Sequence, residues 1–364
     1  MLRAAKWHVP SDFMTYPHFL RVVFNVDMTS SPGYPYMKVA SNNAQFFNYV
    51  DGQFDSDRLQ QIWIMIQNQI NEKVSDPIRL FIKPEPHSIK KMETGRYRLI
   101  SSVSIIDQII DAMLHGELNQ ELIDNWIYTP VRVGWSPLNG GWRRMPFVPK
   151  QMAIDKSSWD WTAQPWLFEV ALEVRKRLCY NLTTKWADLA DWRCQQLFGN
   201  PRFITSGGLL LRQLQPGVMK SGCYNTLMDN SIMQLILHAA VCHTLSIPIG
   251  GIIAMGDDTL QDDLPEPLRS QYMAELSMYC NIKVCKTATE FCGFTFHVSG
   301  EIEPNYRGKH AYKMLYMSDK IADSMAESYT LMYHRSRFSS LIDNFFRKMG
   351  LQFKTRAQRD LLYD

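Results

Sequence analysis

The apolar positions along the chain predict long helices separated by short strands. The clearest helix is residues 105–125, where apolar side chains recur every three or four residues and so share one face. Further helices are predicted at residues 56–74, 225–245 and 266–280, with two more inside 165–198. The tail, 301–364, has a mixed pattern.

Two short apolar strands run into acidic residues. Residues 151–155 read QMAID, so a strand ends on Asp155, and residues 247–263 read as strand, turn and strand with Asp257 and Asp258 in the turn. Other short strands are predicted around 282–285 and 291–298. Because no repeat, low-complexity segment or flexible linker interrupts these elements, we expect the parts of the chain to be interwoven.

Composition narrows the class of protein. The chain has 364 residues, 46% of them hydrophobic, which is enough for a sizeable core without disulfides. Its net charge is only +3, so a site for a polyanion must come from local clustering of charge. Seven cysteines do not suggest a disulfide framework, and no apolar run is long enough for a membrane span or a signal peptide. A soluble intracellular protein is expected.

Carboxylates gather at two strand ends. Asp155 and Asp160 lie in AIDKSSWDW, and Asp257 and Asp258 lie in AMGDDTL. If the two strands are neighbours, Asp155 and Asp257 converge, and clustered carboxylates favour Mg²⁺ or Mn²⁺. An ordinary hairpin turn is the alternative for an isolated Gly-Asp-Asp. The apolar strand before it and the second strand ending in Asp favour a metal site.

A third segment, SGCYNTLMDN, combines a small-residue loop with the start of a helix. Ser221 and Gly222 can bring the backbone close to a ligand, and Thr226 and Asn230 are four residues apart, so they share a helix side. The alternative is a helix start whose polar groups are satisfied locally. The sequence leaves both readings open.

The fourth segment, FIKPEPHSIKKMETGRYRLI, is basic. Closely spaced cations suit a triphosphate or an RNA backbone, and here they are Lys83, Lys90, Lys91, Arg96 and Arg98. A solvated charged surface is the alternative. Its proline residues and Gly95 favour a shaped hairpin or loop.

Taken in order, these segments resemble the motifs of RNA-dependent RNA polymerases from positive-strand RNA viruses. DMTSSPGYPY resembles the loop where the template enters, and KPEPHSIKKMETGRYRLI the basic fingertip motif. DKSSWDW, SGCYNTLMDN and GDD match three palm motifs, and KVCKTATEFCGFTF resembles the lysine and primer-grip motifs that follow. RLISSVSIIDQIIDAMLHGELN is especially similar to the sobemovirus, barnavirus and polerovirus lineage. The resemblance covers roughly residues 27–298.

The resemblance implies an α+β right-hand fold of fingers, palm and thumb, with an antiparallel palm sheet backed by helices. Its expected parts are fingers at 1–150, palm at 151–175, a fingers insertion at 176–215, palm at 216–298 and a small thumb at 299–364.

The implied activity is RNA-templated RNA synthesis for viral genome replication and transcription. A nucleotide would pass from an NTP to an RNA 3′-hydroxyl with the help of two Mg²⁺ (or Mn²⁺) ions. Asp155 and Asp257 would be the main metal ligands, with Asp258 contributing less. Lys286 would be the general acid that protonates pyrophosphate, unless the register favours Lys283.

The resemblance also implies where the substrates bind. The triphosphate would contact Lys83, Lys91 and Arg98. The ribose 2′-hydroxyl would contact Asp160 and Asn230, assisted by Ser221 or Thr226. The template would pass Ser31 and Gly33.

Two side-chain orientations are expected around the first palm motif. Lys156 should point away from the metals, and Trp159 and Trp161 should pack beneath the strand. A zinc site formed by Cys280, Cys285, Cys292 and His297 is disfavoured, since their spacing lacks the paired pattern of structural zinc sites.

The expected partners are the RNA template and product strand, NTPs, other viral replication proteins and, indirectly, host membranes. The expected location is the host cytoplasm, in membrane-associated replication complexes. A reverse transcriptase is disfavoured by the pairing of Asp160 with Asn230. A non-catalytic RNA-binding protein is disfavoured because residues 1–26 form no basic arm.

Overall fold

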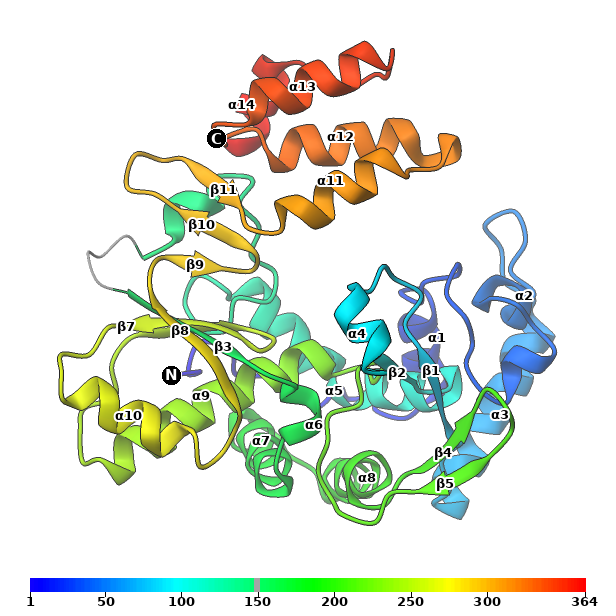
Figure 1. Cartoon of the computed structure of the whole chain (residues 1–364). Coiled ribbons are helices and arrows are strands. Elements are labelled where there is room, and N and C mark those ends of the chain that lie inside the picture. Colours follow the sequence, from blue (N-terminus) through cyan, green and yellow to red (C-terminus); the bar gives the residue numbers. More distant parts are fainter. Residues whose placement is uncertain (147–150) are drawn as a thin grey trace.

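The computed structural model describes residues 1–146 and 151–364. The described residues form three small sheets with helices packed around them (Figure 1). The predicted boundary at residue 150 falls outside the described residues.

The central sheet carries both acidic segments. Its strand order is β6-β7-β3-β8, and all neighbouring strands are antiparallel. The strands are β3 (Gln151–Lys156), β6 (Ile252–Met255), β7 (Asp258–Asp262) and β8 (Ile282–Thr287). This is the antiparallel sheet predicted for the palm.

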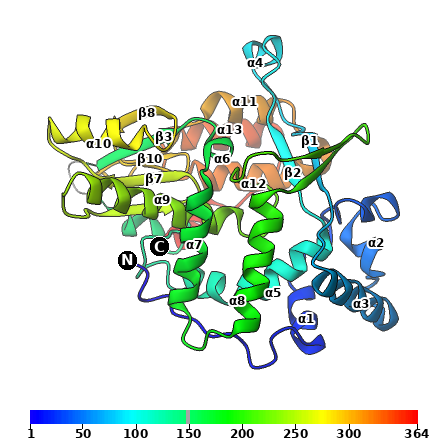
Figure 2. The same cartoon turned by 90° about the horizontal axis from the view of Figure 1, so that it is seen from below.

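Helices cover one face of the central sheet. They are α7 (Pro165–Leu178), α9 (Thr226–Thr244) and α10 (Leu268–Leu276); α9 contacts β6, and both α7 and α10 pack on α9 (Figure 2). Along β3 the side chains alternate: Met152 and Ile154 are buried toward the helices, whereas Asp155 is exposed on the other face. The period-two pattern of the strand therefore delivers Asp155 to the open side.

A second sheet, of order β2-β1-β4-β5, joins distant parts of the chain. Its strands are β1 (Ile78–Ile82), β2 (Leu99–Ser102), β4 (Arg202–Thr205) and β5 (Leu210–Arg212). Because β4 runs parallel to β1, the predicted fingers insertion shares a sheet with the N-terminal segment. The boundaries of the predicted parts stay a prediction.

The other α-helices of residues 1–146 and 151–195 are α1 (Tyr16–Val23), α2 (Asn43–Phe47), α3 (Ser56–Glu72), α4 (Ile89–Glu93), α5 (Ile105–Asp124), α6 (Trp159–Thr162) and α8 (Thr184–Cys194). Helix α5 is largely buried, as its apolar spacing predicted. The basic segment is a β1–β2 hairpin whose tip carries the short helix α4.

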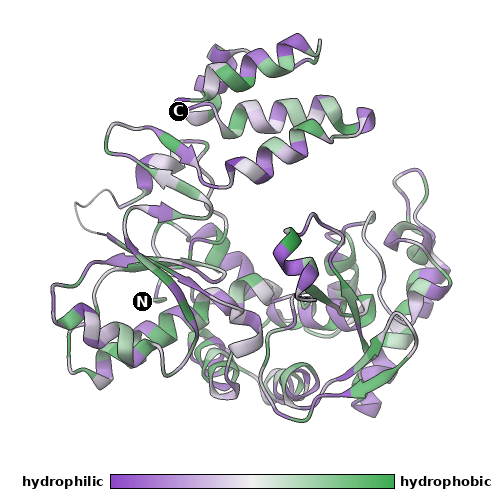
Figure 3. Ribbon diagram, viewed as in Figure 1, coloured by the Kyte–Doolittle hydropathy of each residue, from purple (hydrophilic) through white to green (hydrophobic). Residues whose placement is uncertain are grey.

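The C-terminal part consists of a small sheet followed by four helices. The strands β9 (Glu290–Phe291), β10 (Phe294–Phe296) and β11 (Ile302–Pro304) form the sheet. The helices are α11 (Arg307–Leu315), α12 (Ala322–Met332), α13 (Ser339–Lys348) and α14 (Arg356–Tyr363). Hydrophobic and hydrophilic segments alternate along α12 and α13, as expected for helices with one packed face (Figure 3).

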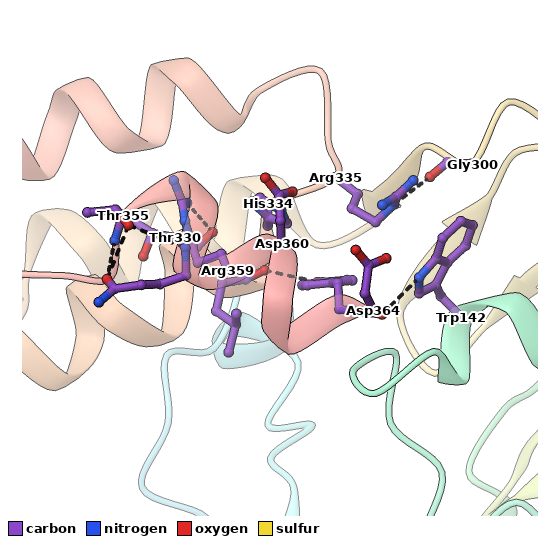
Figure 4. Close-up of polar contacts among 12 residues, drawn as sticks. Trp142, Gly300, Thr330, His334, Arg335, Thr355, Arg359, Asp360 and Asp364 are labelled. Atoms are coloured by element: carbon purple, nitrogen blue, oxygen red, sulfur yellow. Dashed lines mark hydrogen bonds and ion pairs between the residues drawn. The ribbon is translucent and has the colours of Figure 1, made fainter.

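The last helix folds back on the rest of the chain (Figure 4). The Arg359 guanidinium donates to the Thr330 carbonyl at 2.7 Å, which ties α14 to α12. The Trp142 indole N–H donates to the Tyr363 carbonyl at 3.2 Å. The second contact fixes α14 against the segment around Trp142.

One expected orientation is wrong. Trp159 is buried, but the Trp161 side chain is 55% exposed instead of packing beneath the strand. The chain turns into α6 at Trp159, so the two-residue alternation of a strand no longer applies there.

Candidate active site

Three carboxylates meet at one edge of the central sheet. Ile154 pairs with Thr259, so Asp155 at the end of β3 lies beside Asp258 at the start of β7. Asp257 stands in the tight turn between β6 and β7, where Gly256 has a φ of 64° that a larger residue would adopt only with strain. All three acidic side chains are exposed on the open side.

These carboxylates disturb one another. Although Asp258 reaches the surface, desolvation by the protein packed around it, together with the charges of Asp257 and Asp155, raises its pKa to about 6. Such crowding disfavours ionisation unless cations are present, and oxygen ligands suit Mg²⁺ or Mn²⁺. In the part of the chain that the structure describes, no three ligand side chains already form a closed metal cage. The donor set fits divalent ions, with some adjustment needed on binding.

A lysine holds Asp155 in this structure. The Lys283 ammonium lies 2.5 Å from Asp155 Oδ2, next to a bulge where the pairing of β3 with β8 shifts by one residue. Lys286, the predicted general acid, instead pairs with Glu290 at 3.0 Å. Both lysines line one hollow with Asp155 and Asp258, so the choice between them stays open.

Lys156 points to the opposite face, as expected. Its side chain is buried, and the ammonium donates to Thr259 Oγ1 at 3.3 Å. Burial lowers its pKa, while Asp257 and Asp258 act in the other direction. A cation therefore lies beneath the acidic edge and not among its three carboxylates.

The predicted ribose-binding pair is assembled from two helices. The Asn230 amide on α9 donates to Asp160 Oδ1 on α6 at 3.3 Å, and the Trp159 indole N–H donates to Asn230 Oδ1 at 2.8 Å. Burial raises the pKa of Asp160, and the hydrogen bond from Asn230 opposes that shift. The Trp159 contact fixes the amide so that its nitrogen faces the carboxylate.

The Ser-Gly loop approaches the protein itself. Ser221 Oγ accepts from the Ser101 N–H at 3.1 Å, and the Gly222 N–H donates to the Ser101 carbonyl at 3.1 Å. A Cβ on Gly222 would lie 2.5 Å from that carbonyl oxygen, so the position requires glycine. The loop thereby joins β2 of the fingertip hairpin to the start of α9.

Thr226 is hydrogen-bonded within its own loop, and its assistance to the ribose contact stays a prediction. Its hydroxyl donates within the loop, at 2.8 Å from the carbonyls of Lys220 and Cys223.

Lys220 was not predicted from the sequence, although it directly precedes the Ser-Gly pair. Its side chain is fully buried, and its ammonium bonds the carbonyls of Gly217 and Val218, so it braces the loop.

Two of the basic residues, Lys83 and Arg98, contact the same carboxylate, that of Glu85. The Lys83 N–H donates to the Arg98 carbonyl at 2.8 Å, and both side chains contact Glu85, at 3.5 Å for Lys83 and 3.0 Å for Arg98. The positive charge of Arg98 also acts, weakly, to lower the pKa of Asp160. Lys91 lies on α4 and is exposed.

The predicted template residues differ in exposure. Ser31 is exposed and lines a cavity between α1 and α5 that Tyr224 also lines. Gly33 is buried, and a Cβ there would lie 2.8 Å from the Val103 carbonyl. Packing explains Gly33, while a template contact stays a prediction for both residues.

The cysteines give no sign of metal binding or of cross-linking. All seven are free thiols in the structure, and the described residues contain no zinc-like cluster.

Among residues 1–146 and 151–364, no helix is both long and apolar enough to cross a lipid bilayer.

Comparison with known sequences identifies relatives among plant and fungal virus proteins. The chain is 29% identical to the RNA-directed RNA polymerase of Mushroom bacilliform virus, over 93% of this chain and 86% of that protein. It is 31% identical to Protein P1-P2 of Potato leafroll virus and 31% identical to Replicase polyprotein P2AB of Southern cowpea mosaic virus. These two matches include 72% and 73% of this chain, but they span only 26% and 30% of the two longer viral proteins.

Comparison with solved structures identifies a viral polymerase with a similar fold. The Sicinivirus 3Dpol RNA-dependent RNA polymerase superposes with a TM-score of 0.76, covering 100% of this chain and 82% of that one at 16% identity. A sequence profile described as viral RNA-dependent RNA polymerase matches residues 18–311, which include the acidic edge, the Ser-Gly loop and the fingertip hairpin. The chain therefore belongs to the family of viral RNA-dependent RNA polymerases.

Proposed function

We propose that this enzyme catalyses RNA-templated RNA synthesis by a two-metal mechanism centred on Asp155 and Asp257, with Asp258 as a weaker participant. The observation that carries the proposal is the meeting of three exposed carboxylates at the edge of the central sheet. Two bound Mg²⁺ or Mn²⁺ ions would lower the pKa of the attacking 3′-hydroxyl and stabilise the leaving oxygen.

Lys283 has a place in this scheme. Its ammonium lies 2.5 Å from Asp155 Oδ2, so it would compete with a cation for that carboxylate. Lys283 and Lys286 line the same hollow as Asp155 and Asp258. We retain Lys286 as the proposed proton donor to pyrophosphate, with Lys283 as the alternative.

The same geometry supports the proposed substrate contacts. Asp160 and Asn230 are held together and offer polar groups to a ribose 2′-hydroxyl, with Ser221 at the adjoining loop. Lys83, Lys91 and Arg98 would hold the triphosphate on the fingertip hairpin. The exposure of Ser31 at a cavity supports a contact with the template there.

We further propose that the enzyme acts in genome replication and transcription in the host cytoplasm. Its attachment to membrane-associated replication complexes would come from other viral proteins. This part of the proposal is supported by the family membership alone.

Templated incorporation of labelled NTPs tests the reaction itself. The purified chain should extend RNA only when template and Mg²⁺ or Mn²⁺ are present, and EDTA should stop synthesis until excess metal is added back. RNA binding without incorporation, under every metal and primer condition, would favour the non-catalytic RNA-binding alternative.

Replacing Asp160 with Ala should weaken selection of ribose. A polar pocket penalises a deoxyribose by leaving its groups unpaired, so we expect discrimination between NTP and dNTP to fall about tenfold. The measurement is the ratio of kcat/KM for the two nucleotides. Asp188→Ala, which removes an exposed carboxylate on α8, is the control and should keep wild-type selectivity. A wild-type preference for dNTPs would favour a reverse transcriptase instead.

A further inference from the structure

The fingertip hairpin is connected to the C-terminal helices by charge. Glu85 follows β1, and its carboxylate is contacted by Lys83 and Arg98 from its own hairpin. A third cation, Lys309 on α11, reaches the same carboxylate at 3.7 Å from Glu85 Oε2. Helix α11 faces α4 and the β1–β2 hairpin in both views of the molecule (Figures 1 and 2).

The four charged side chains of this cluster differ in how far they are buried, and Glu85 is the most buried of them. The Glu85 side chain is only 14% exposed, whereas Lys83, Arg98 and Lys309 are 36%, 57% and 45% exposed. Although burial opposes it, the three cations together hold the pKa of Glu85 below its ordinary value. The carboxylate therefore stays charged, while each cation keeps donors that face solvent.

The cluster has an excess of positive charge beside the acidic site. Three cations surround one carboxylate, which leaves two positive charges unmatched. Tyr306, which directly precedes α11, and His310, next to Lys309 on α11, line a hollow together with Asp257 and Asp258. An anion bound by the cluster would thus lie near the carboxylates that hold the metals.

We propose that Lys309 is a third triphosphate-binding cation, supplied by the C-terminal helices, and that Glu85 is the positioning residue that gathers it with Lys83 and Arg98. The inference rests on the proposed assignment of Lys83 and Arg98 to the triphosphate. It adds a residue from outside the fingertip motif and makes nucleotide binding depend on how α11 sits against the hairpin.

Substitutions on α11 separate this role from a general effect of charge. Lys309→Met should raise KM for NTPs about fivefold and leave kcat within about twofold, since an exposed charge-assisted contact contributes modestly. Lys309→Arg keeps the charge and should restore KM to near the wild-type value. Lys313→Met removes an exposed lysine one turn further along α11 and should change nothing. Glu85→Gln should raise KM more than Lys309→Met, because all three cations lose their shared anchor.

A second measurement needs no turnover. Inorganic tripolyphosphate binding, followed by calorimetry, should weaken in Lys309→Met by the same factor as KM, while affinity for the RNA template stays at the wild-type value. An unchanged KM, an equal effect of Lys313→Met, or a loss of RNA affinity in Lys309→Met would each overturn the inference. If wild type incorporates nucleotides and Asp257→Asn does not, such a result refutes only the role of Lys309 and leaves the proposed reaction intact.

Discussion

Replacing Asp257 with Asn is expected to lower templated nucleotide incorporation by about 10³-fold or more, because it removes a charge from the proposed metal site. Asp257 stands in the turn between β6 and β7, exposed and directly beside the paired ends of β3 and β7. The substitution keeps the size of the side chain, so the turn and the sheet should be preserved. Single-turnover incorporation with saturating NTP measures the effect on the chemical step.

Asp262→Asn is the matched control for this loss. Asp262 ends the same strand, β7, but its carboxylate accepts from the Gly251 N–H at 2.7 Å, a bond that an asparagine oxygen also accepts. The same change of charge at the far end of the strand should therefore leave activity near the wild-type level. Equal activity of Asp257→Asn and wild type would refute the assignment of the catalytic edge.

The acidic edge was predictable because its signals are local. The apolar alternation of β3 determines on which face Asp155 emerges, and the Gly-Asp-Asp turn between apolar strands marks a hairpin. The pairing of Asp160 with Asn230 followed from the resemblance, and the structure places the two side chains in contact. In these places the short-range pattern and the tertiary fold agree.

The missed features depend on contacts between distant parts of the chain. Position 222 requires glycine because the Ser101 carbonyl lies close to it, and Glu85 is contacted by Lys309 from α11. Both contacts join residues far apart in the sequence, so no spacing pattern predicts them. Trp161 was misplaced because a short helix begins at Trp159, directly after the strand. The last helix had a readable signal, the capping box formed by Thr355 and Gln358, which the mixed apolar pattern of the tail obscured.

Arg193→Met is expected to cause the largest loss of stability. The Arg193 guanidinium on α8 contacts Asp111 at 2.6 Å and Asp107 at 2.5 Å, both on α5, and it also bonds Ser75. The arginine side chain is 1% exposed and each aspartate 2%. Removing the arginine leaves two buried carboxylates uncompensated, which costs about 3–5 kcal/mol of unfolding free energy. Arg177→Met, which breaks an exposed pair with Glu173 on α7, should cost less than about 1 kcal/mol.

The loss in Arg193→Met should depend on pH in a defined direction. Burial raises the pKa of Asp107 to about 6 even with Arg193 present, so folding favours the protonated acid. Without the arginine this pKa rises further, because the charge that favoured ionisation is gone. A group whose folded pKa lies above its unfolded value contributes stability at low pH and loses it as the pH rises through the folded pKa. The difference in unfolding free energy between wild type and Arg193→Met should therefore be larger at pH 8 than at pH 5. Denaturant unfolding at both values measures it, and a deficit that grows at pH 5 would contradict the role of Arg193 as the counter-charge of this buried cluster.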